Sequence, residues 1–300
     1  MSVDGSFLQL PRVESIRKAF LIRQNGDCPS AGVTALYDVL NDWALDATIT
    51  NAKMDERIEC EKHIDFLCGE FPDVAKKSIL LLDRGFPSLR LITKLSQLDV
   101  KFVMRCSTQF LSEINDAPMG DTNVVLSNGI CVRVVKFKLS SDETEILVSN
   151  LFGLPTSDFP QLYAKRWGIE TMYHTIKKVL CVEKFSGKTE NTILQDFWVT
   201  MVLLNCVAVF TKESDKLVKK QRANKQNKHK YKTRVSDLVV TLRDRFIFCS
   251  LCGVVPLTDT EIKSTLEILA YSVTADIKNR SFPRNPKPHL NANHSLKSHL

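Results

Sequence analysis

The sequence predicts an α/β fold, a mixed sheet flanked by helices with a β-rich insertion, and three patterns carry this prediction. The apolar run SILLL at 78–82 is typical of a strand buried on both faces of an α/β sheet. Residues 54–71 have apolar side chains at helical spacing, which predicts an amphipathic helix. Asn128-Gly129, between two strand-like runs, indicates a β-hairpin well inside the chain.

The first 107 residues are predicted to alternate between strands and helices. Strands are expected at 3–10, twice within 33–49, at 78–82 and at 101–106, and helices at 54–71 and 89–98. The break Asp83-Arg84-Gly85 ends the strand at 78–82. We expect this segment, 1–107, to be the first part of an α/β core.

The pattern changes after residue 107. Residues 108–151 are rich in strand-like runs and predict a β-rich insertion. Helix returns near Pro160 and is expected again at the apolar run 197–210 and at 259–277. The second part of the core is therefore placed at 152–278, and the Pro-containing remainder 279–300 predicts a flexible tail.

Composition favours a globular cytoplasmic protein. Of the 300 residues, 44% are apolar and 25% charged, and the first residues lack the apolar stretch of a secretion signal. The run 197–210 is shorter than the roughly 18 residues of a membrane span, so we expect a core helix and no membrane. Nine cysteines form no framework, and the pair Cys249 and Cys252 lacks two further zinc ligands, so reduced thiols are expected.

Positive charge is concentrated in one segment. The whole chain has a net charge of +7, but residues 212–234 hold ten Lys or Arg against two acids, a local +8 that leaves −1 elsewhere. Such a segment suits a surface that follows phosphates, and Lys219, Lys220 and Arg222 are its candidate DNA contacts. A solvated loop without a partner has the same composition, which does not decide between the two.

The segment YAKRWGIETMYHTIKK, at 163–178, contains a single acid in a basic helix. At 100° per residue, Tyr163, Arg166 and Lys177 fall within about 40° of Glu170 and form a stripe about 60° wide. This stripe flanks the apolar face of the predicted helix. Trp167 could stack on a displaced base, although an aromatic residue beside Ile169 is more often part of a core.

Three acids stand where catalysis could use them. Asp4 lies in the first strand, Asp83 ends a buried strand, and Glu170 projects from the helix. Three carboxylates could hold two divalent cations, which in phosphodiester cleavage activate water and stabilise the leaving oxygen. Each acid also has a structural interpretation: Asp-Gly pairs form turns, and Glu170 could simply pair with Arg166.

The residues carry a resemblance to a known family. The row Tyr163, Arg166, Glu170 and Lys177 resembles the YREK signature of IS4-type insertion-sequence transposases, which are DDE enzymes. The stretches VDGSFLQLP and ILLLDRGFPS resemble the blocks around that family's two catalytic aspartates, here Asp4 and Asp83. ALYDVLNDWALDAT and EILVSNL resemble the strands between these blocks and before the Glu helix. The resemblance runs in the same order over most of residues 1–200.

That resemblance implies an RNase H-like fold and a DNA-cleaving activity. The implied catalytic and metal-binding residues are Asp4, Asp83 and Glu170, with two Mg²⁺ or Mn²⁺ ions that assist hydrolysis at transposon ends and strand transfer into target DNA. Arg166, Lys177 and Tyr163 would hold the double-stranded DNA end. Similar transposases work as dimers on DNA, and the expected location is the bacterial cytoplasm, at the nucleoid.

The sequence also departs from the family's pattern. Only three residues precede Asp4, and the N-terminal region that recognises inverted repeats in similar transposases is missing. We therefore expect an N-terminally truncated transposase. The alternative function is that of a catalytically inactive remnant that binds DNA through its basic segment.

Overall fold

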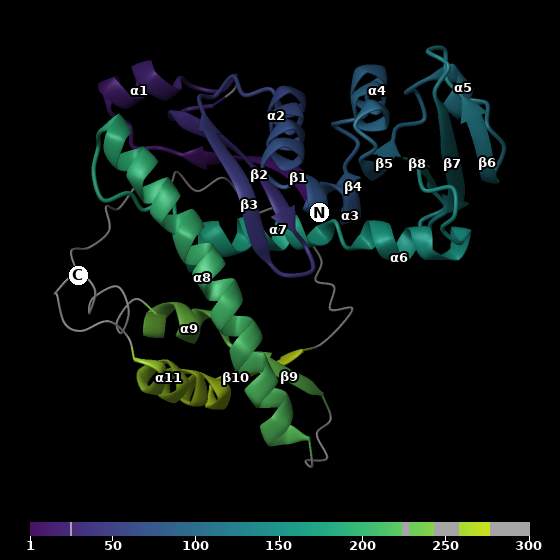
Figure 1. Cartoon of the computed structure of the whole chain (residues 1–300). Helices are drawn as coiled ribbons and strands as arrows, with labels where there is room; N and C mark the ends of the chain where they lie inside the picture. The colour runs from purple at the N-terminus through teal and green to yellow at the C-terminus, as the bar shows by residue number, and fades with distance from the viewer. Residues whose placement is uncertain (25, 224–228, 243–257, 277–300) are drawn as a thin grey trace. The chain divides into compact units, whose positions relative to one another are not determined.

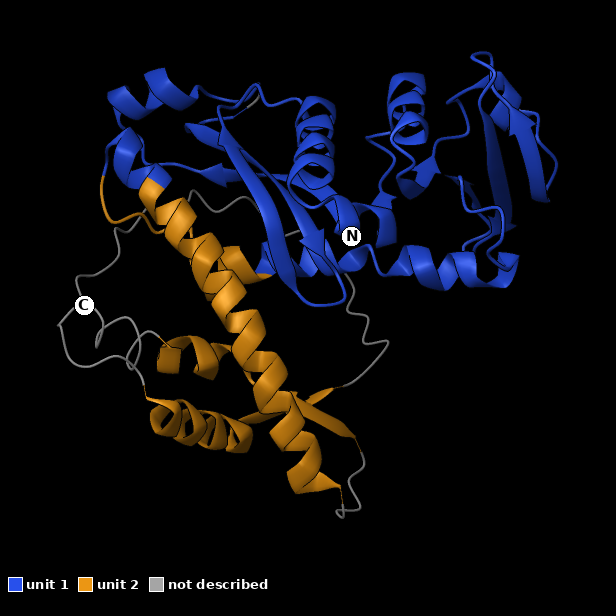
Figure 2. Ribbon diagram, viewed as in Figure 1, with its two compact units in different colours: residues 1–174, 188–194 blue, residues 175–187, 195–300 orange. Residues whose placement is uncertain are grey.

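The computed structural model describes residues 1–24, 26–223, 229–242 and 258–276. The chain divides into two compact units, Met1–His174 with Lys188–Leu194, and Thr175–Gly187 with Gln195–Leu300 (Figure 2). Each unit has its own packed core and is described separately below. The predicted boundaries at 107, 151 and 278 do not coincide with this division, and they remain predictions about domains.

Unit 1 contains an eight-stranded mixed sheet in the order β3-β2-β1-β4-β5-β8-β7-β6 (Figure 1). The strands β1, β4 and β5 are mutually parallel, and every other neighbouring pair is antiparallel. The order 3-2-1-4-5 with an antiparallel first hairpin is the RNase H-like arrangement, so the predicted fold class is confirmed. The strands are β1 (Ser2–Gln9), β2 (Ser30–Asp38), β3 (Trp43–Thr50), β4 (Ile79–Leu82), β5 (Lys101–Cys106), β6 (Gly120–Val125), β7 (Cys131–Lys138) and β8 (Thr144–Ser149).

The central strands are apolar on both faces because helices cover both faces. In β4, Leu80 and Leu82 pack into the larger core and Leu81 into the smaller one. The same alternation runs through β5, where Phe102 and Val103 point to opposite sides. The run at 78–82 is therefore apolar because the strand is buried on both faces, as predicted from the sequence.

The helices of unit 1 fall on two sides of the sheet. α2 and α4 supply side chains to the larger core, and α6 supplies Phe159 and Tyr163 to the smaller one (Figure 1). α2 begins where the Asp55 side chain accepts the backbone N–H groups of Arg57 and Ile58. The helices are α1 (Glu14–Phe20), α2 (Glu56–Glu70), α3 (Pro72–Lys77), α4 (Leu89–Gln97), α5 (Ser112–Asn115), the 3₁₀ turn η1 (Thr156–Asp158), α6 (Phe159–Ala164) and α7 (Trp167–His174).

The predicted β-rich segment extends the sheet. Its hairpin turns at Asn128-Gly129, where Gly129 has a φ of 81° that glycine adopts without strain, and β6 pairs antiparallel with β7. β8 then pairs with β5, so the three strands β8, β7 and β6 continue the same sheet. This arrangement places the end of β8 shortly before α6, at the start of the helical segment that carries the predicted site.

Unit 2 is largely helical. Its core joins Val207 of α8 to Leu238, Leu242 and Leu269. The predicted helix at 259–277 is wrong after Tyr271, because the residues that follow pair antiparallel with β9 as a strand. Its elements are the π-helix η2 (Thr175–Val179), most of α8 (Glu190–Arg222), β9 (Lys230–Thr233), α9 (Val235–Leu242), α11 (Asp259–Tyr271) and β10 (Val273–Asp276). Cys249, Cys252 and the tail 279–300 lie outside the described residues.

The helix α8 is much longer than its apolar run suggests. Among the described residues it is the one helix that is long and apolar enough to cross a membrane by length and composition. A buried core helix satisfies the same criteria, and Phe197 and Leu204 are indeed buried. The absence of a membrane span remains a prediction.

Candidate functional site

Two of the predicted acids lie side by side at the centre of the sheet. β1 and β4 run parallel with Ser2 opposite Leu81, so the chains bring Asp4 beside Asp83 two residues further on. Neighbouring strands are about 4.8 Å apart, and residues that are directly adjacent in a parallel pair point to the same face. Each carboxylate accepts a backbone N–H from the next residue, from Gly5 at 2.8 Å and from Arg84 at 2.6 Å.

Arg166 connects the third acid to this pair. Its Nη2 donates a hydrogen bond of 2.7 Å to Glu170 Oε1, and its Nη1 lies 3.8 Å from Asp83 Oδ2. The Arg166 side chain is only 6% exposed, whereas Asp83 and Glu170 are 38% and 37% exposed. Asp4 also interacts electrostatically with Arg166. Arg166 therefore contacts Asp83 and Glu170 directly, and its charge also acts on Asp4.

α7 is held against β1 by a buried hydroxyl and a glycine. Tyr173 donates a hydrogen bond of 2.8 Å to the backbone carbonyl of Asp4. A β-carbon on Gly168 would lie 3.1 Å from that of Val39, so glycine lets the first turn of α7 approach the end of β2. Glu170 lies between these two anchors on the same helix. Its position relative to Asp4 is thus fixed from both sides.

We expect Tyr173→Phe to lower the free energy of unfolding by about 1 kcal/mol, because it leaves the partly buried Asp4 carbonyl without this donor. Urea unfolding of the parent and the variant measures the difference. The matched change Tyr271→Phe removes the hydroxyl of a residue that is 78% exposed and should cost almost nothing. Equal stability of the two variants would show that the bond to Asp4 does not hold α7.

The helical row of the predicted signature is not one regular helix. Backbone bonds from Arg166 N to Tyr163 O and from Ile169 N to Arg166 O tighten the chain between α6 and α7 to 3₁₀ geometry. After His174 the chain widens into the π-helix η2. A constant 100° per residue therefore does not describe the segment, and the single stripe 60° wide is wrong in detail.

The remaining members of the row have different surroundings. Tyr163 is 6% exposed and its hydroxyl is buried without a hydrogen-bond partner among the described residues, so it does not offer a surface contact as it stands. Lys177 is in η2 and belongs to unit 2, so its approach to the carboxylates remains a prediction. The core interpretation of Trp167 is wrong, since its side chain is 55% exposed.

The basic segment is partly described. Lys219 and Lys220 are exposed in the last turns of α8. The guanidinium of Arg222 lies 4.3 Å from the ring centroid of Tyr231 on β9, a cation–π contact that directs the arginine toward the protein. Residues 224–228 lie outside the described part. The role of these three cations in DNA binding remains a prediction.

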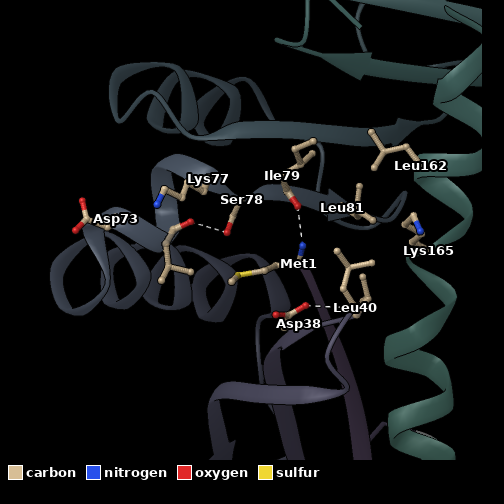
Figure 3. Close-up of a pocket in the computed structure, with 12 residues that line it drawn as sticks. Met1, Asp38, Leu40, Asp73, Lys77, Ser78, Ile79, Leu81, Leu162 and Lys165 are labelled. Atoms are coloured by element: carbon tan, nitrogen blue, oxygen red, sulfur yellow. Dashed lines mark hydrogen bonds between the residues drawn. The ribbon is translucent and has the colours of Figure 1, made fainter. Parts of the chain in front are cut away.

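A cavity of about 370 Å³ opens beside the start of β1 (Figure 3). In it, the amino group of Met1 donates a hydrogen bond of 2.7 Å to Ile79 O. Leu81, Leu162 and Lys165 line one wall. None of the three predicted acids lines the cavity, so we do not assign the cavity to the predicted site.

The amino-acid sequence matches the model of one protein family. A family model described as a transposase DDE domain matches residues 2–206, more than half of the chain. The chain belongs to this family of DDE transposase domains. The matched range includes Asp4, Asp83 and Glu170. No curated protein matches the chain.

Structural comparison adds a distant neighbour of this transposase domain. The cryo-EM structure of the piggyBac transposase synaptic complex with hairpin DNA is similar with a TM-score of 0.49 and 11% sequence identity. The similarity covers 93% of this chain and 58% of that one.

DDE transposases generally use divalent metal ions, and the donor chemistry at this site suits them. All three predicted ligands offer carboxylate oxygens, which hard cations prefer. However, within the described ranges no three acidic, His or Cys side chains are close enough to hold one ion as they stand. Arg166 supplies the positive charge between Asp83 and Glu170 instead.

The surroundings of Asp4 disfavour the charged form of its carboxyl group. Burial raises the pKa of Asp4 to about 6, although the Gly5 amide and Arg166 oppose the rise. The negative charges of Glu56 and Asp83 raise this pKa further. A second cation near Asp4 would offset this cost.

We expect metal-free stability to fall as pH rises from about 4 to 6. Asp4 has a higher pKa in the folded than in the unfolded protein, so the folded state binds more protons in this window and loses stability as Asp4 ionises. Asp4→Asn should therefore raise the metal-free unfolding free energy at pH 7, by roughly 2 kcal/mol, and flatten the pH profile. Urea unfolding at several pH values tests this. A variant that is less stable than the parent at pH 7 would contradict it.

Sequence patterns do not single out two further residues beside the predicted acids, Glu56 and Tyr173. Glu56 is the first residue of α2, where an acid is common for reasons of helix stability, so nothing in the sequence marks it. Tyr173 follows Ile169 at helical spacing, which indicates an apolar face and gives no sign of the hydrogen bond to Asp4. Its hydroxyl is the signal that could have indicated the contact, because the hydroxyl of a buried Tyr usually has a partner, whereas Phe has no such group.

Proposed function

We propose that this chain is the catalytic domain of an IS4-type insertion-sequence transposase, which cleaves DNA at transposon ends and joins them to target DNA. The observation that carries the proposal is the meeting of Asp4, Asp83 and Glu170 around Arg166, in a chain of the DDE transposase family. Double-stranded DNA is the proposed substrate, and a homodimer on DNA the proposed working form.

Each side chain would have a defined task. Asp4, Asp83 and Glu170 would hold two Mg²⁺ or Mn²⁺ ions, which supply Lewis acidity for hydrolysis and transesterification of phosphodiesters when bound. For this, Glu170 would have to exchange Arg166 for a cation. Arg166 would then be free to donate paired hydrogen bonds to a DNA phosphate beside the carboxylates.

Positioning would come from the fold. Asp4 lies on β1, Asp83 directly follows the neighbouring strand β4, and Tyr173 ties α7 to the backbone of Asp4. Hydrogen bonds from neighbouring residues, such as that of Tyr173, hold catalytic groups in place and restrict their motion. Trp167, exposed next to Arg166, is available to stack on a base at the DNA end.

The test is metal-dependent nicking of supercoiled plasmid DNA by the purified chain. We expect nicked product with Mn²⁺, none with EDTA, and none from Glu170→Ala under either condition. Relaxation by the Glu170→Ala variant at the parent's rate would mean that another site or a contaminant cleaves the DNA.

A second candidate function is metal-independent DNA binding by an inactive transposase domain. One observation favours it: among the described residues, no three acidic, His or Cys side chains are placed to hold an ion. Arg166 instead lies between Asp83 and Glu170. In that case nicking should be absent while binding to plasmid DNA remains and weakens steeply with salt.

A further inference from the structure

A fourth carboxylate lies beside the three predicted ones. A β-carbon built on Gly5 would lie 2.5 Å from Glu56 Oε1, so the carboxylate of Glu56 sits directly over the residue after Asp4. The other oxygen, Oε2, is 3.9 Å from a β-carbon built on Gly85. Glu56 therefore lies between the two short segments, Asp-Gly and Asp-Arg-Gly, that carry the catalytic aspartates.

The position of Glu56 is fixed by the start of α2. Asp55 caps the helix, and Arg57 Nε donates a hydrogen bond of 2.7 Å to the backbone carbonyl of Gly85. The helix end is thus tied to the loop that follows β4. A carboxylate on the first residue of a helix anchored in this way has little freedom to move away from Asp83.

An acid in the first turn favours the helix dipole, but this general effect does not explain why the carboxylate lies beside other acids. Among the described residues it forms no hydrogen bond or ion pair, and it is only partly exposed. The nearby charges of Asp83 and Asp55 act against it, and the positive charge of Arg23 only partly compensates. A half-buried acid among like charges is costly unless a cation joins them.

Arg166 gives an independent sign that this place takes a ligand. Its side chain is 6% exposed, and two of its nitrogens, Nε and Nη1, donate no hydrogen bond within the described structure. Buried guanidinium groups normally use their donors. These two nitrogens could therefore donate hydrogen bonds to an anionic ligand, as expected if a DNA phosphate binds beside Arg166.

We propose that Glu56 contributes a fourth carboxylate to the divalent-cation site formed by Asp4, Asp83 and Glu170. This inference rests on the proposed function. Four carboxylates and one DNA phosphate carry five formal negative charges and Arg166 one positive charge, which matches two divalent ions. Glycine is also required at position 5 in this arrangement, because any side chain there would displace the carboxylate of Glu56.

Direct measurement of Mn²⁺ binding tests the proposal without relying on activity. Electron paramagnetic resonance of free Mn²⁺ in titrations of the full chain gives the dissociation constant. We expect Glu56→Gln to weaken Mn²⁺ binding at least tenfold, because it removes a charged group of the site and loss of groups that merely orient ligands already costs about this much. Glu70→Gln, the same change at an exposed position of the same helix, should bind like the parent.

A glycine pair provides a second test that keeps Glu56 itself. Gly5→Ala should weaken Mn²⁺ binding as Glu56→Gln does, because the new methyl group pushes the carboxylate aside. Gly69→Ala in α2 has nothing within 4 Å of the new carbon and should bind like the parent. The double variant Gly5→Ala with Glu56→Gln should show no further loss.

The outcomes separate this inference from the proposed function. If Glu56→Gln binds Mn²⁺ as tightly as Glu70→Gln while Asp4→Asn binds weakly, the role of Glu56 is overturned and the three-carboxylate site stands. If the parent chain binds no Mn²⁺, both are overturned. Should Glu56→Gln fail to fold by circular dichroism, normal Mn²⁺ binding by Gly5→Ala would overturn the role of Glu56.

Discussion

Asp83→Asn should reduce the single-turnover rate of DNA nicking by on the order of 10³-fold, with DNA affinity unchanged or slightly higher. Asp83 lies beside Asp4 at the centre of the sheet, so its carboxylate faces the proposed ions directly. The amide keeps the shape but loses a charged ligand, and several kcal/mol of metal assistance correspond to a loss of about this size. Removing a negative charge beside bound DNA does not weaken DNA binding.

The measurement compares rates at saturating protein and Mn²⁺, with Kd for DNA taken separately from filter binding. Glu70→Gln serves as the exposed-acid control and should nick DNA at the parent's rate. If Asp83→Asn lost DNA binding in proportion to its rate, the acid would be holding the protein together and not acting in the cleavage step.

Arg166→Met should destabilise the metal-free protein by about 2 kcal/mol. Loss of one partner from a buried ion pair commonly costs 3–5 kcal/mol, and we expect less here because Asp83 and Glu170 are more than a third exposed and partly solvated. Methionine fills much of the arginine's volume, so the change chiefly removes the charge that balances the carboxylates.

Saturating Mn²⁺ should reduce this difference, because a bound cation replaces the missing positive charge and stabilises the folded state by mass action. Urea unfolding with and without Mn²⁺ measures both values. Arg90→Met is the control, since Arg90 is 80% exposed in its pair with Glu61 and should change stability by less than about 0.5 kcal/mol. If Mn²⁺ does not reduce the destabilisation caused by Arg166→Met, the charge of Arg166 does not substitute for a metal ion at this site.

The sheet was largely predictable because its strands obey simple burial rules. The strand at 78–82 must be apolar on both faces, since cores lie on both sides of it, and Asn128-Gly129 fits a tight hairpin. β10 was missed because pairing with β9 depends on a partner some 40 residues away in the chain. Local helical spacing in 259–277 carries no sign of such a pairing.

The positions of the predicted acids in the fold could be argued from the sequence, but the geometry around them could not. Asp83 follows a buried strand, and Glu170 flanks the apolar face of a helix. Both positions could therefore be predicted from the spacing of apolar residues. The 3₁₀ turn before α7 and the π-helix after it have no clear sequence signal, and they interrupt the regular helical spacing from which the row was predicted. Glu56 became visible only when folding placed it over Gly5.

The most direct test of the shared carboxylate site is a crystal structure with Mn²⁺, in which anomalous scattering locates the metal. The account predicts at least one Mn²⁺ with oxygens of Asp4 and Asp83 at about 2.1 Å, and Glu170 turned from Arg166 toward it. Mn²⁺ bound only elsewhere on the protein, with Glu170 still paired to Arg166, would contradict it.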